Sequence, residues 1–453
     1  MGLTTPAAAP SRSVPWRSQT APEDRGLARL RAVWGRSDAL FELLTPDALL
    51  AQPIPLRQPF IFYMGHLPAF AWNHLGRRLR GLPALHGAFE ELFARGIDPP
   101  DLDAVPAGAD AGWPDPSHVR DYRDRVREAI EAAFGAGRER RARERRLLAM
   151  VVEHELMHHE TLLYMLQALP LAQKVRPDGV EYDFERYVPS GRQARVPGGR
   201  VRLGAAPDAL PFGWDNEFPE HDVDVSSVLM DVAPVRNSEF LRFVADGGYA
   251  RRELWTPEAW AWRERQAIEH PFSWTRQGGA WLQRTTFDHP PLERASEWPA
   301  YVSFAEASAY ARWRGSRLPT EAELERAAYG GTDGARAHPW GDVPPGPEHG
   351  NFDFQRWSPA PVGSHPAGAT PEGVLELVGN GWEWTSTVFG PFPGFKPMPE
   401  YPGYSSDFFD GAHYVLRGAS WATDRALVRR TFRNWFQVHY PYVFAKFRCV
   451  DAA

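Results

Sequence analysis

One unbroken helical stretch constrains the fold of this chain more than any other segment. Residues 146–166 contain no Pro or Gly, and a run of this length favours a helix over a strand. Within it, His154 and His158 lie four residues apart, so both imidazoles project from one helix face with Cβ atoms roughly 5–6 Å apart. Apolar neighbours predict that this face points inward: Val151, Leu162 and Met165. Because a buried, unpaired imidazole is costly, the pattern indicates a shared metal ion; two solvated or core histidines are the alternative.

Two histidines do not hold a catalytic metal alone, because such a site usually takes three protein ligands and keeps open positions. His66 is the best candidate for the third ligand. It lies in an apolar, helix-like segment over residues 60–82, which a helical bundle would bring beside the histidine helix. His74 lies two turns further along the same segment and is the alternate ligand. Either residue could instead be a capped or solvated histidine.

The stretch from His154 to His158 is also a literal HExxH match, which in zinc proteases makes Glu155 a general base. The pattern is short and therefore weak. No Gly-rich third-ligand motif follows it, and the second half of the chain has a different texture. The protease interpretation therefore ranks below a metal site of another kind.

The composition excludes several classes of protein. A net charge of −6 gives no reason to expect nucleic acid or an anionic membrane as a partner. Cys449 is the only cysteine, which excludes an intramolecular disulfide and a Cys-rich zinc or iron–sulfur site. No run approaches the roughly 20 apolar residues of a membrane span, and residues 1–22 show no signal-peptide core. We therefore expect a soluble, cytoplasmic protein with a disordered leader over residues 1–22.

The texture of the sequence changes near residue 180. Before it, four helix-like segments predict an up-and-down bundle over residues 23–180 that carries the metal ligands. After a linker over residues 181–195, Gly, Pro and Trp become frequent and short strand-like pieces alternate with turns. The expected fold class is therefore an α-helical bundle followed by an α+β domain over residues 196–453.

Four motifs in the second half resemble the signature of formylglycine-generating-enzyme (sulfatase-modifying-factor) domains, which have a C-type-lectin-like α+β fold. They are GWDNE at 213–217, RLPTEAE at 317–323, GNGWEWT at 379–385 and LRGASW at 416–421. Those enzymes bind copper through two cysteines, and a chain with only Cys449 cannot repeat that chemistry. The first half resembles a DinB-like four-helix bundle. This order of domains is that of the ergothioneine-type sulfoxide synthases, which the chain resembles over most of its length.

The resemblance implies a metal, a substrate and a reaction. In that family a GHxxxF-like motif and an HExxHxE motif supply three histidines to Fe(II), which here correspond to His66, His154 and His158. O2 binds there beside hercynine, the Nα-trimethylated histidine, and sulfur is joined to imidazole C2. Asn434 and Trp435 resemble the family's hercynine pocket, where an aromatic wall and an amide oxygen suit a trimethylammonium group. A core tryptophan in a Trp-rich domain is the alternative for Trp435.

The positions that resemble the family's donor site have changed. Family members that use γ-glutamylcysteine hold its carboxylates with arginines, and one such motif reads ARGIDPPD at 94–101 here, which is acidic. The Asp and Arg that follow the family's RNW motif are Phe436 and Tyr440 here. An aromatic ring does not replace bidentate capture by arginine. Phe389 occupies the position that corresponds to the family's active-site tyrosine. Met157 occupies the position of the family's Gln, just before the second histidine of the helix motif.

Hercynine-side residues are thus kept and donor-side residues are changed, which favours an uncharged or sugar-like donor. Within the family this pattern most resembles the selenoneine synthases. It implies a non-haem Fe(II), O2-dependent enzyme that forms a C–Se bond between a selenosugar and imidazole C2 of hercynine. The expected substrate-binding residues are Asn434, Trp435, Phe436, Tyr440 and Phe389. The alternatives are the same chemistry with cysteine or another thiol, and a lectin-like binding protein with a vestigial metal site.

Overall fold

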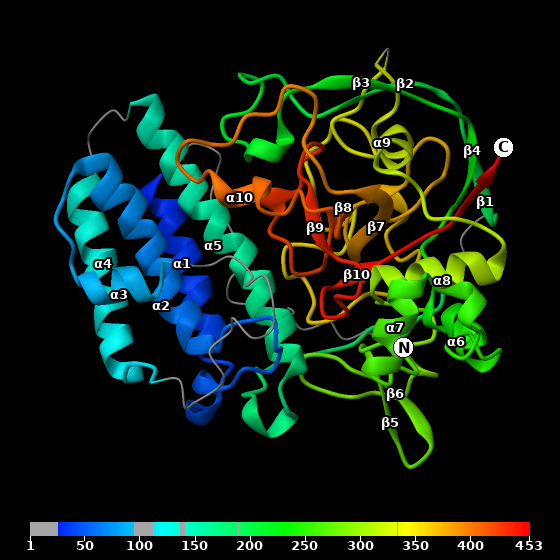
Figure 1. Cartoon of the computed structure of the whole chain (residues 1–453), viewed down its shortest axis with the longest axis horizontal. Helices are drawn as coiled ribbons and strands as arrows, with labels where there is room; N and C mark the ends of the chain where they lie inside the picture. Colours follow the sequence, from blue (N-terminus) through cyan, green and yellow to red (C-terminus); the bar gives the residue numbers. More distant parts are fainter. Residues whose placement is uncertain (1–25, 95–111, 136–140, 188–190, 333) are drawn as a thin grey trace, which may run out of the picture.

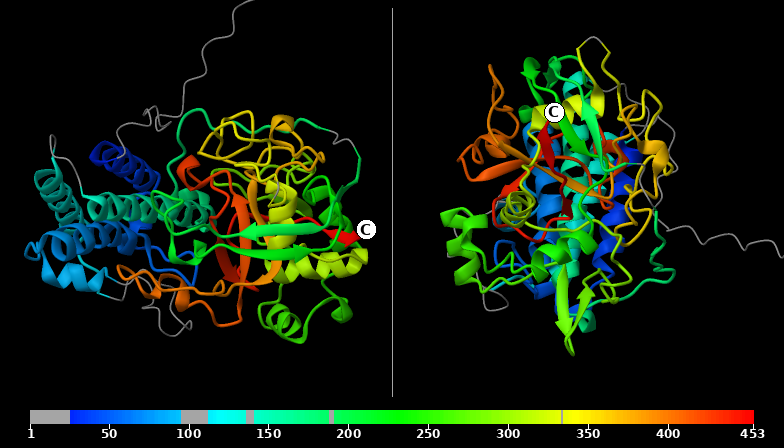
Figure 2. Two further views of the ribbon diagram at one scale, coloured as in Figure 1. Left: turned by 90° about the horizontal axis from the view of Figure 1, so that it is seen from above. Right: turned by 90° about the vertical axis from the view of Figure 1, so that its right-hand side faces the viewer.

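The computed structural model describes residues 26–94, 112–135, 141–187, 191–332 and 334–453. The expected leader and residues 95–101 of the acidic motif lie outside the described residues. A helical domain and a domain with short sheets lie side by side, and α5 (Ala142–Ala168) runs along their boundary (Figures 1 and 2). This arrangement confirms the predicted fold class, a helical bundle followed by an α+β domain.

Within the described residues, four long helices and one short helix form the N-terminal domain: α1 (Leu27–Phe41), α2 (Phe60–Ala71), α3 (Gly87–Leu92), α4 (Pro116–Phe134) and α5. Apolar residues at helical spacing build its core, as Val119, Val126 and Ile130 do on the buried face of α4. Among the described residues, no helix combines the length and the hydropathy that a membrane-spanning segment requires.

Helix α2 packs closely against its neighbours around His66. A Cβ atom at Gly65 would lie 2.4 Å from the ring of Phe93, so only glycine permits this approach. Pro68 lies inside α2 and removes one backbone donor, and the chain continues as a π-helical segment over Trp72–Leu79. The helix predicted over residues 60–82 therefore has two parts, and its first part buries the His66 side chain completely.

Short sheets dominate the C-terminal domain. The largest has the strand order β10–β7–β8–β9, comprising β10 (Ala445–Lys446), β7 (Gly381–Val388), β8 (His413–Ala419) and β9 (Asn434–Gln437). Strands β7, β8 and β9 pair antiparallel, whereas β10 is parallel to β7. The smaller sheets are β1 (Gln193–Val196) with β4 (Val228–Asp231) and β11 (Val450–Ala452), β2 (Gly199–Leu203) with β3 (His221–Val225), and β5 (Trp274–Gln277) with β6 (Ala280–Gln283).

The described helices of this domain are α6 (Asn237–Ala245), α7 (Pro257–Arg265), α8 (Phe304–Arg314), α9 (Glu321–Tyr329) and α10 (Gly403–Ser406), and α9 packs against β2, β3, β7 and β8. The sequence predicts that Ser303 and Thr320 begin two of them with capping boxes, and both boxes are present. Helix α7 is not predicted from the sequence, although the hydroxyl of Thr256 caps it and Pro257 occupies its first turn.

The contacts of Lys174 link the end of the bundle to the second domain. They lead us to expect that the stability of the protein depends on pH. The ammonium of Lys174 donates to the carbonyl oxygens of Gln167 (3.2 Å) and Thr286 (2.8 Å), and burial lowers its pKa to about 7. Between pH 7 and about 10 the unfolded chain binds a proton here that the folded chain does not, so stability rises with pH over that window. We expect the urea midpoint of the natural protein to rise from pH 7 to 9.5, and Lys174→Met to lose most of that rise. Equal rises in both proteins would contradict this assignment.

Candidate metal centre and substrate cavity

Helix α5 divides its side chains among three faces, because residues three or four apart share a face. One face turns toward α2 and carries His154 and His158. A second turns toward α1, where Glu155 and His159 both contact Ser37. The third meets the C-terminal domain: Glu153, Met157, Glu160 and Tyr164.

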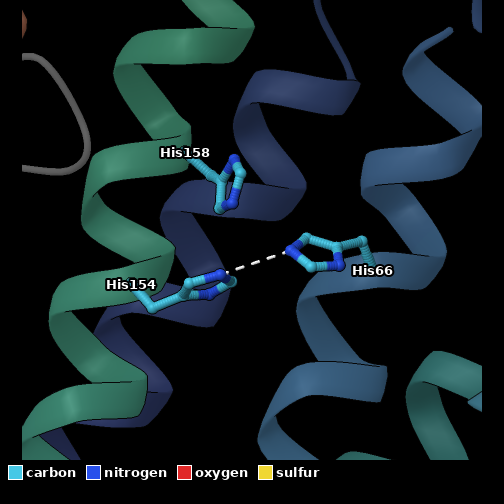
Figure 3. A group of neighbouring side chains, drawn as sticks. All are labelled: His66, His154 and His158. Carbon is cyan, nitrogen blue, oxygen red and sulfur yellow. Dashed lines mark hydrogen bonds between the residues drawn. The ribbon is translucent and has the colours of Figure 1, made fainter. Parts of the chain in front are cut away.

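The structure brings the three predicted ligands together (Figure 3). His66 from α2 and His154 and His158 from α5 each offer one ring nitrogen, and these nitrogens lie within 4.8 Å of one another. The Nε2 atoms of His66 and His154 are 3.2 Å apart, and the ring centroids of His154 and His158 are 4.6 Å apart. Three nitrogens at this spacing can contact a single metal ion placed between them.

The three histidines of the cluster are neutral, which is the protonation state in which an imidazole can bind a metal. Burial lowers the pKa of His66 to about 4, and it lowers the pKa of His154 and of His158 well below the usual value. The Nδ1 of His66 donates to the carbonyl oxygen of Phe93 at 2.7 Å, which leaves the Nε2 lone pair directed at the other two rings. The ring of Phe70 stacks on His154 at 3.6 Å. Three neutral, oriented imidazoles fit a transition metal such as iron, zinc or copper.

The alternate ligand and the protease interpretation do not fit this geometry. His74 packs against the ring of Phe70 at 4.3 Å and does not belong to the cluster that the described residues form. Glu155 faces α1 and accepts a hydrogen bond from the Ser37 hydroxyl. A general base must reach the proton that it abstracts. Glu155, on a different helix face from His154 and His158, is not placed for that role.

A cavity of about 180 Å³ lies between α5 and the C-terminal domain. The bundle lines it with His154 and His158, whereas the other domain lines it mainly from β9 and the residues around that strand. Four of the five predicted substrate residues line this cavity: Asn434, Trp435, Phe436 and Tyr440. The cavity thus joins the candidate metal centre to the candidate substrate wall.

The fifth predicted residue, Phe389, does not line the cavity. Its backbone N–H donates to the carbonyl of His413 just beyond the end of β7. Its side chain lies in the core, where it stacks on Trp435 at 4.2 Å and lies 5.0 Å from the guanidinium of Arg433. Phe389 therefore supports the Trp435 wall from behind, and the expectation that it contacts substrate is corrected.

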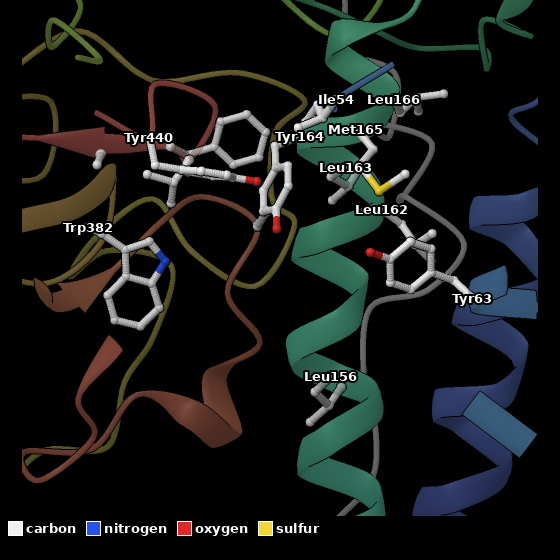
Figure 4. Close-up of a cluster of buried hydrophobic side chains, with 14 of the residues drawn as sticks. Ile54, Tyr63, Leu156, Leu162, Leu163, Tyr164, Met165, Leu166, Trp382 and Tyr440 are labelled. Carbon is white, nitrogen blue, oxygen red and sulfur yellow. The ribbon is translucent and has the colours of Figure 1, made fainter. Parts of the chain in front are cut away.

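One cation and several aromatic rings form one end of the cavity. Arg57 donates from Nε to the hydroxyl of Tyr164 at 2.8 Å, and its guanidinium lies 5.1 Å from the ring centroid of Tyr440. Tyr440 stacks on Phe436 at 4.9 Å. Its hydroxyl points toward the ring of Tyr164 (Figure 4) and is buried without a hydrogen-bond partner among the described residues. The sequence gives no signal for Arg57, because it lies in a Pro-rich loop far along the chain from Tyr440.

A tyrosine of α10 reaches the ligand helix from the other domain. The hydroxyl of Tyr404 donates to Sδ of Met157 at 3.3 Å, and its ring stacks on Trp214 at 4.0 Å. Burial raises the pKa of Tyr404 well above its usual range, so the phenol remains protonated. Tyr404 therefore supplies the cavity with a phenol, which the phenylalanine at the position of the family's active-site tyrosine, Phe389, lacks. No sequence motif predicts this role of Tyr404.

Comparison with known proteins agrees with the two-domain architecture. Residues 29–162 match the DinB superfamily, and residues 184–453 match the sulfatase-modifying factor enzyme 1-like domain. A hercynine oxygenase of Mycobacterium tuberculosis is 38% identical over 419 residues, which cover 88% of this chain and 92% of that protein. A hercynine oxygenase of Mycolicibacterium thermoresistibile is 35% identical over 413 residues, covering 87% of each chain. Ergothioneine biosynthesis protein 1 of Neurospora crassa is 28% identical over 505 residues, covering 92% of this chain and 57% of that one.

The bundle, the sulfatase-modifying-factor-type domain and the histidine cluster at their boundary define a class of two-domain proteins. The chain belongs to the ergothioneine-type sulfoxide synthase family. The resemblance drawn from the sequence motifs is confirmed at the level of the family.

Proposed function

We propose that this protein is an Fe(II)- and O2-dependent synthase that joins the chalcogen of a small donor to imidazole C2 of hercynine. The observation that carries the proposal is a three-histidine cluster, with His66 and His154 buried and His158 half-buried, beside a cavity whose far wall is aromatic. The names of the relatives support hercynine as the substrate. His66, His154 and His158 would hold the iron, which when bound supplies the activation of O2.

The wall around Trp435 suits the trimethylammonium group of hercynine. A quaternary ammonium cannot donate hydrogen bonds, and its charge is attracted to the face of an indole ring. The side-chain oxygen of Asn434, which the sequence assigned to the trimethylammonium group, instead accepts the backbone N–H of Trp435 at 2.9 Å. Its NH2 group, for which no described residue supplies an acceptor, is therefore available to the carboxylate of hercynine.

Trp435→Ala should weaken hercynine binding about thirtyfold, since a desolvated cation–π contact contributes roughly 2 kcal/mol. The measurement is calorimetric titration of iron-loaded, oxygen-free protein with hercynine and, as a matched ligand, with histidine. Histidine lacks the methyl groups, so the variant should lose most of the preference for hercynine over histidine. An unchanged preference would show that the trimethylammonium group binds elsewhere.

The first candidate donor is cysteine or another small thiol. The relatives named for ergothioneine biosynthesis support sulfur as the chalcogen. Arg57 lines the cavity beside Tyr440, and a guanidinium suits the carboxylate of an amino-acid thiol.

The second candidate donor is a selenosugar, favoured by a different observation. Phe436 and Tyr440 stack at 4.9 Å. The motif resemblance implies that they replace the charged anchors of family members that use γ-glutamylcysteine. The other cavity arginine, Arg433, is already paired with Glu321 at 2.9 Å. Aromatic faces and neutral side chains suit a sugar ring better than a donor with two carboxylates.

A donor panel tests the proposed function. Iron-loaded protein is mixed with hercynine, O2 and, in turn, cysteine, a thiosugar, a selenosugar and γ-glutamylcysteine, and adducts are identified by mass spectrometry. Best turnover with cysteine supports the first candidate, and best turnover with the selenosugar supports the second. Preference for γ-glutamylcysteine would contradict both donor assignments. Hercynine binding without an adduct from any donor would favour the lectin-like alternative.

A further inference from the structure

A third histidine lines the same cavity beside His154 and His158 and does not belong to the three-histidine cluster. His413 is the first residue of β8, and its side chain is only 6% exposed. Its Nδ1 lies 3.0 Å from each carboxylate oxygen of Asp410, three residues earlier. The ring of Phe408 packs edge-on against the imidazole at 5.2 Å. The imidazole is therefore fixed by one carboxylate and one aromatic ring.

This contact sets the chemistry of the imidazole. The carboxylate accepts the Nδ1 proton, so neutral His413 carries its lone pair on Nε2. No described residue forms a hydrogen bond with that Nε2. Burial acts to raise the pKa of Asp410, but the hydrogen bonds from His413 and from the backbone N–H of Ala412, together with the charge of His413, outweigh it and the pKa is lowered, which keeps the carboxylate ionised. An ionised carboxylate on Nδ1 stabilises the imidazolium that forms when Nε2 takes a proton.

His413 lies across the β8–β9 ladder from a residue of the cavity wall. In the β8–β9 ladder His413 is opposite Gln437, and Tyr414 is opposite Phe436. Gln437 and Phe436 both line the cavity. Paired residues share a face of the sheet, so His413 lies on the face of Gln437 and Trp435, whereas Phe436 lies on the other face. Residues of both faces line the same cavity, so a donor in this cavity meets His413 on the side of Gln437 and Trp435.

We propose that His413, oriented by Asp410, is the base that deprotonates the chalcogen of the donor; this inference rests on the proposed function. The chalcogen–hydrogen bond breaks, its electron pair stays on sulfur or selenium, and the proton moves to Nε2 of His413. The product is a thiolate or selenolate beside an imidazolium paired with Asp410. For sulfur, the thiolate rather than the thiol is the nucleophile and metal ligand.

The proposal makes a prediction that a structural role for His413 does not. Selenols are stronger acids than thiols, so a selenol reaches the cavity largely ionised and needs the base less. His413→Asn keeps a donor toward Asp410 but removes the basic nitrogen. We expect kcat/KM for cysteine to fall about a hundredfold, the usual contribution of a positioned base, and kcat/KM for selenocysteine to fall much less.

The experiment measures kcat/KM of iron-loaded protein with hercynine and each member of two matched pairs, cysteine with selenocysteine and a thiosugar with its selenosugar. Asp410→Asn retains the imidazole and should show the same thiol–selenol difference with a smaller loss, which guards against misfolding of the first variant. His338→Asn, a histidine outside the cavity, is the control. Equal losses with thiol and selenol, or no loss with thiol, would overturn the role of His413. No adduct with the natural protein and any donor would overturn the proposed function itself, and the inference with it.

Discussion

Replacement of His158 by alanine should abolish stoichiometric iron binding. The three ligand nitrogens lie within 4.8 Å of one another, and a site with two remaining imidazoles loses one of its three protein donors. Loss of even an outer-shell partner commonly costs about 10–100-fold in metal affinity, so the loss of a ligand should exceed that. We expect the variant to retain less than a tenth of the iron of the natural protein and to form no detectable hercynine adduct.

The neighbouring residue provides a matched control for this prediction. His159 lies on the α1-facing side of the same helix, where its Nε2 is 2.8 Å from the Ser37 hydroxyl. His159→Asn should therefore retain iron. A thermal melt gives a readout independent of activity, because a ligand that binds only the folded state raises the unfolding midpoint. Fe(II) should raise the midpoint of the natural protein and of His159→Asn but not that of His158→Ala. Full iron retention in His158→Ala would refute the proposed ligand set.

Arg429→Leu should destabilise the joint between the two domains by about 3–5 kcal/mol, the usual cost of removing one partner from a buried ion pair. Arg429 contacts Glu153 of α5 at 2.9 Å and Glu217 of the other domain at 2.5 Å, and its side chain is 16% exposed. Burial acts to raise the pKa of Glu217, but the charge and hydrogen bonds of Arg429, together with hydrogen bonds from Thr431 and the backbone N–H of Trp214, outweigh it and the pKa is lowered. At Glu153 burial prevails and raises the pKa to about 7, so Glu217 is the carboxylate that remains ionised and loses its cation when Arg429 is removed.

The measurement is the midpoint of unfolding in urea, with Arg200→Leu as the matched control. Arg200 pairs with Asp224 on the surface, where the two side chains are 60% and 76% exposed, and such pairs contribute little. We expect a large fall in the midpoint for Arg429→Leu and almost none for Arg200→Leu. Equal behaviour of the two variants would show that the Glu153–Arg429–Glu217 contacts do not hold the domains together.

The metal ligands could be predicted from sequence because their geometry is mostly local. Residues four apart on a helix share a face, which fixes His154 relative to His158 before any tertiary contact forms. His66 required one further step, the expectation that two apolar helices of a bundle lie side by side. The capping boxes at Ser303 and Thr320 are equally local, since each depends on a residue three positions away.

The rest of the site could not be predicted, because contacts between residues far apart in the sequence determine its position. Arg57 reaches the cavity through Tyr164 and Tyr440, which lie on different domains. His413 and Asp410 are only three residues apart, but nothing local shows that they face the same cavity as His158. Alignment to a family motif also cannot tell whether an aromatic residue faces a cavity or stacks behind its wall. For that reason Phe389 was expected in the cavity and lies behind Trp435.

One isotope measurement tests the proposed reaction most directly. Iron-loaded protein is supplied with O2, the best donor of the panel and hercynine that carries deuterium at imidazole C2. If the new bond forms at C2, the carbon–chalcogen bond replaces the C2–deuterium bond, so we expect every adduct molecule to have lost the label. An adduct that keeps its deuterium would place the new bond elsewhere on hercynine and contradict the proposed function.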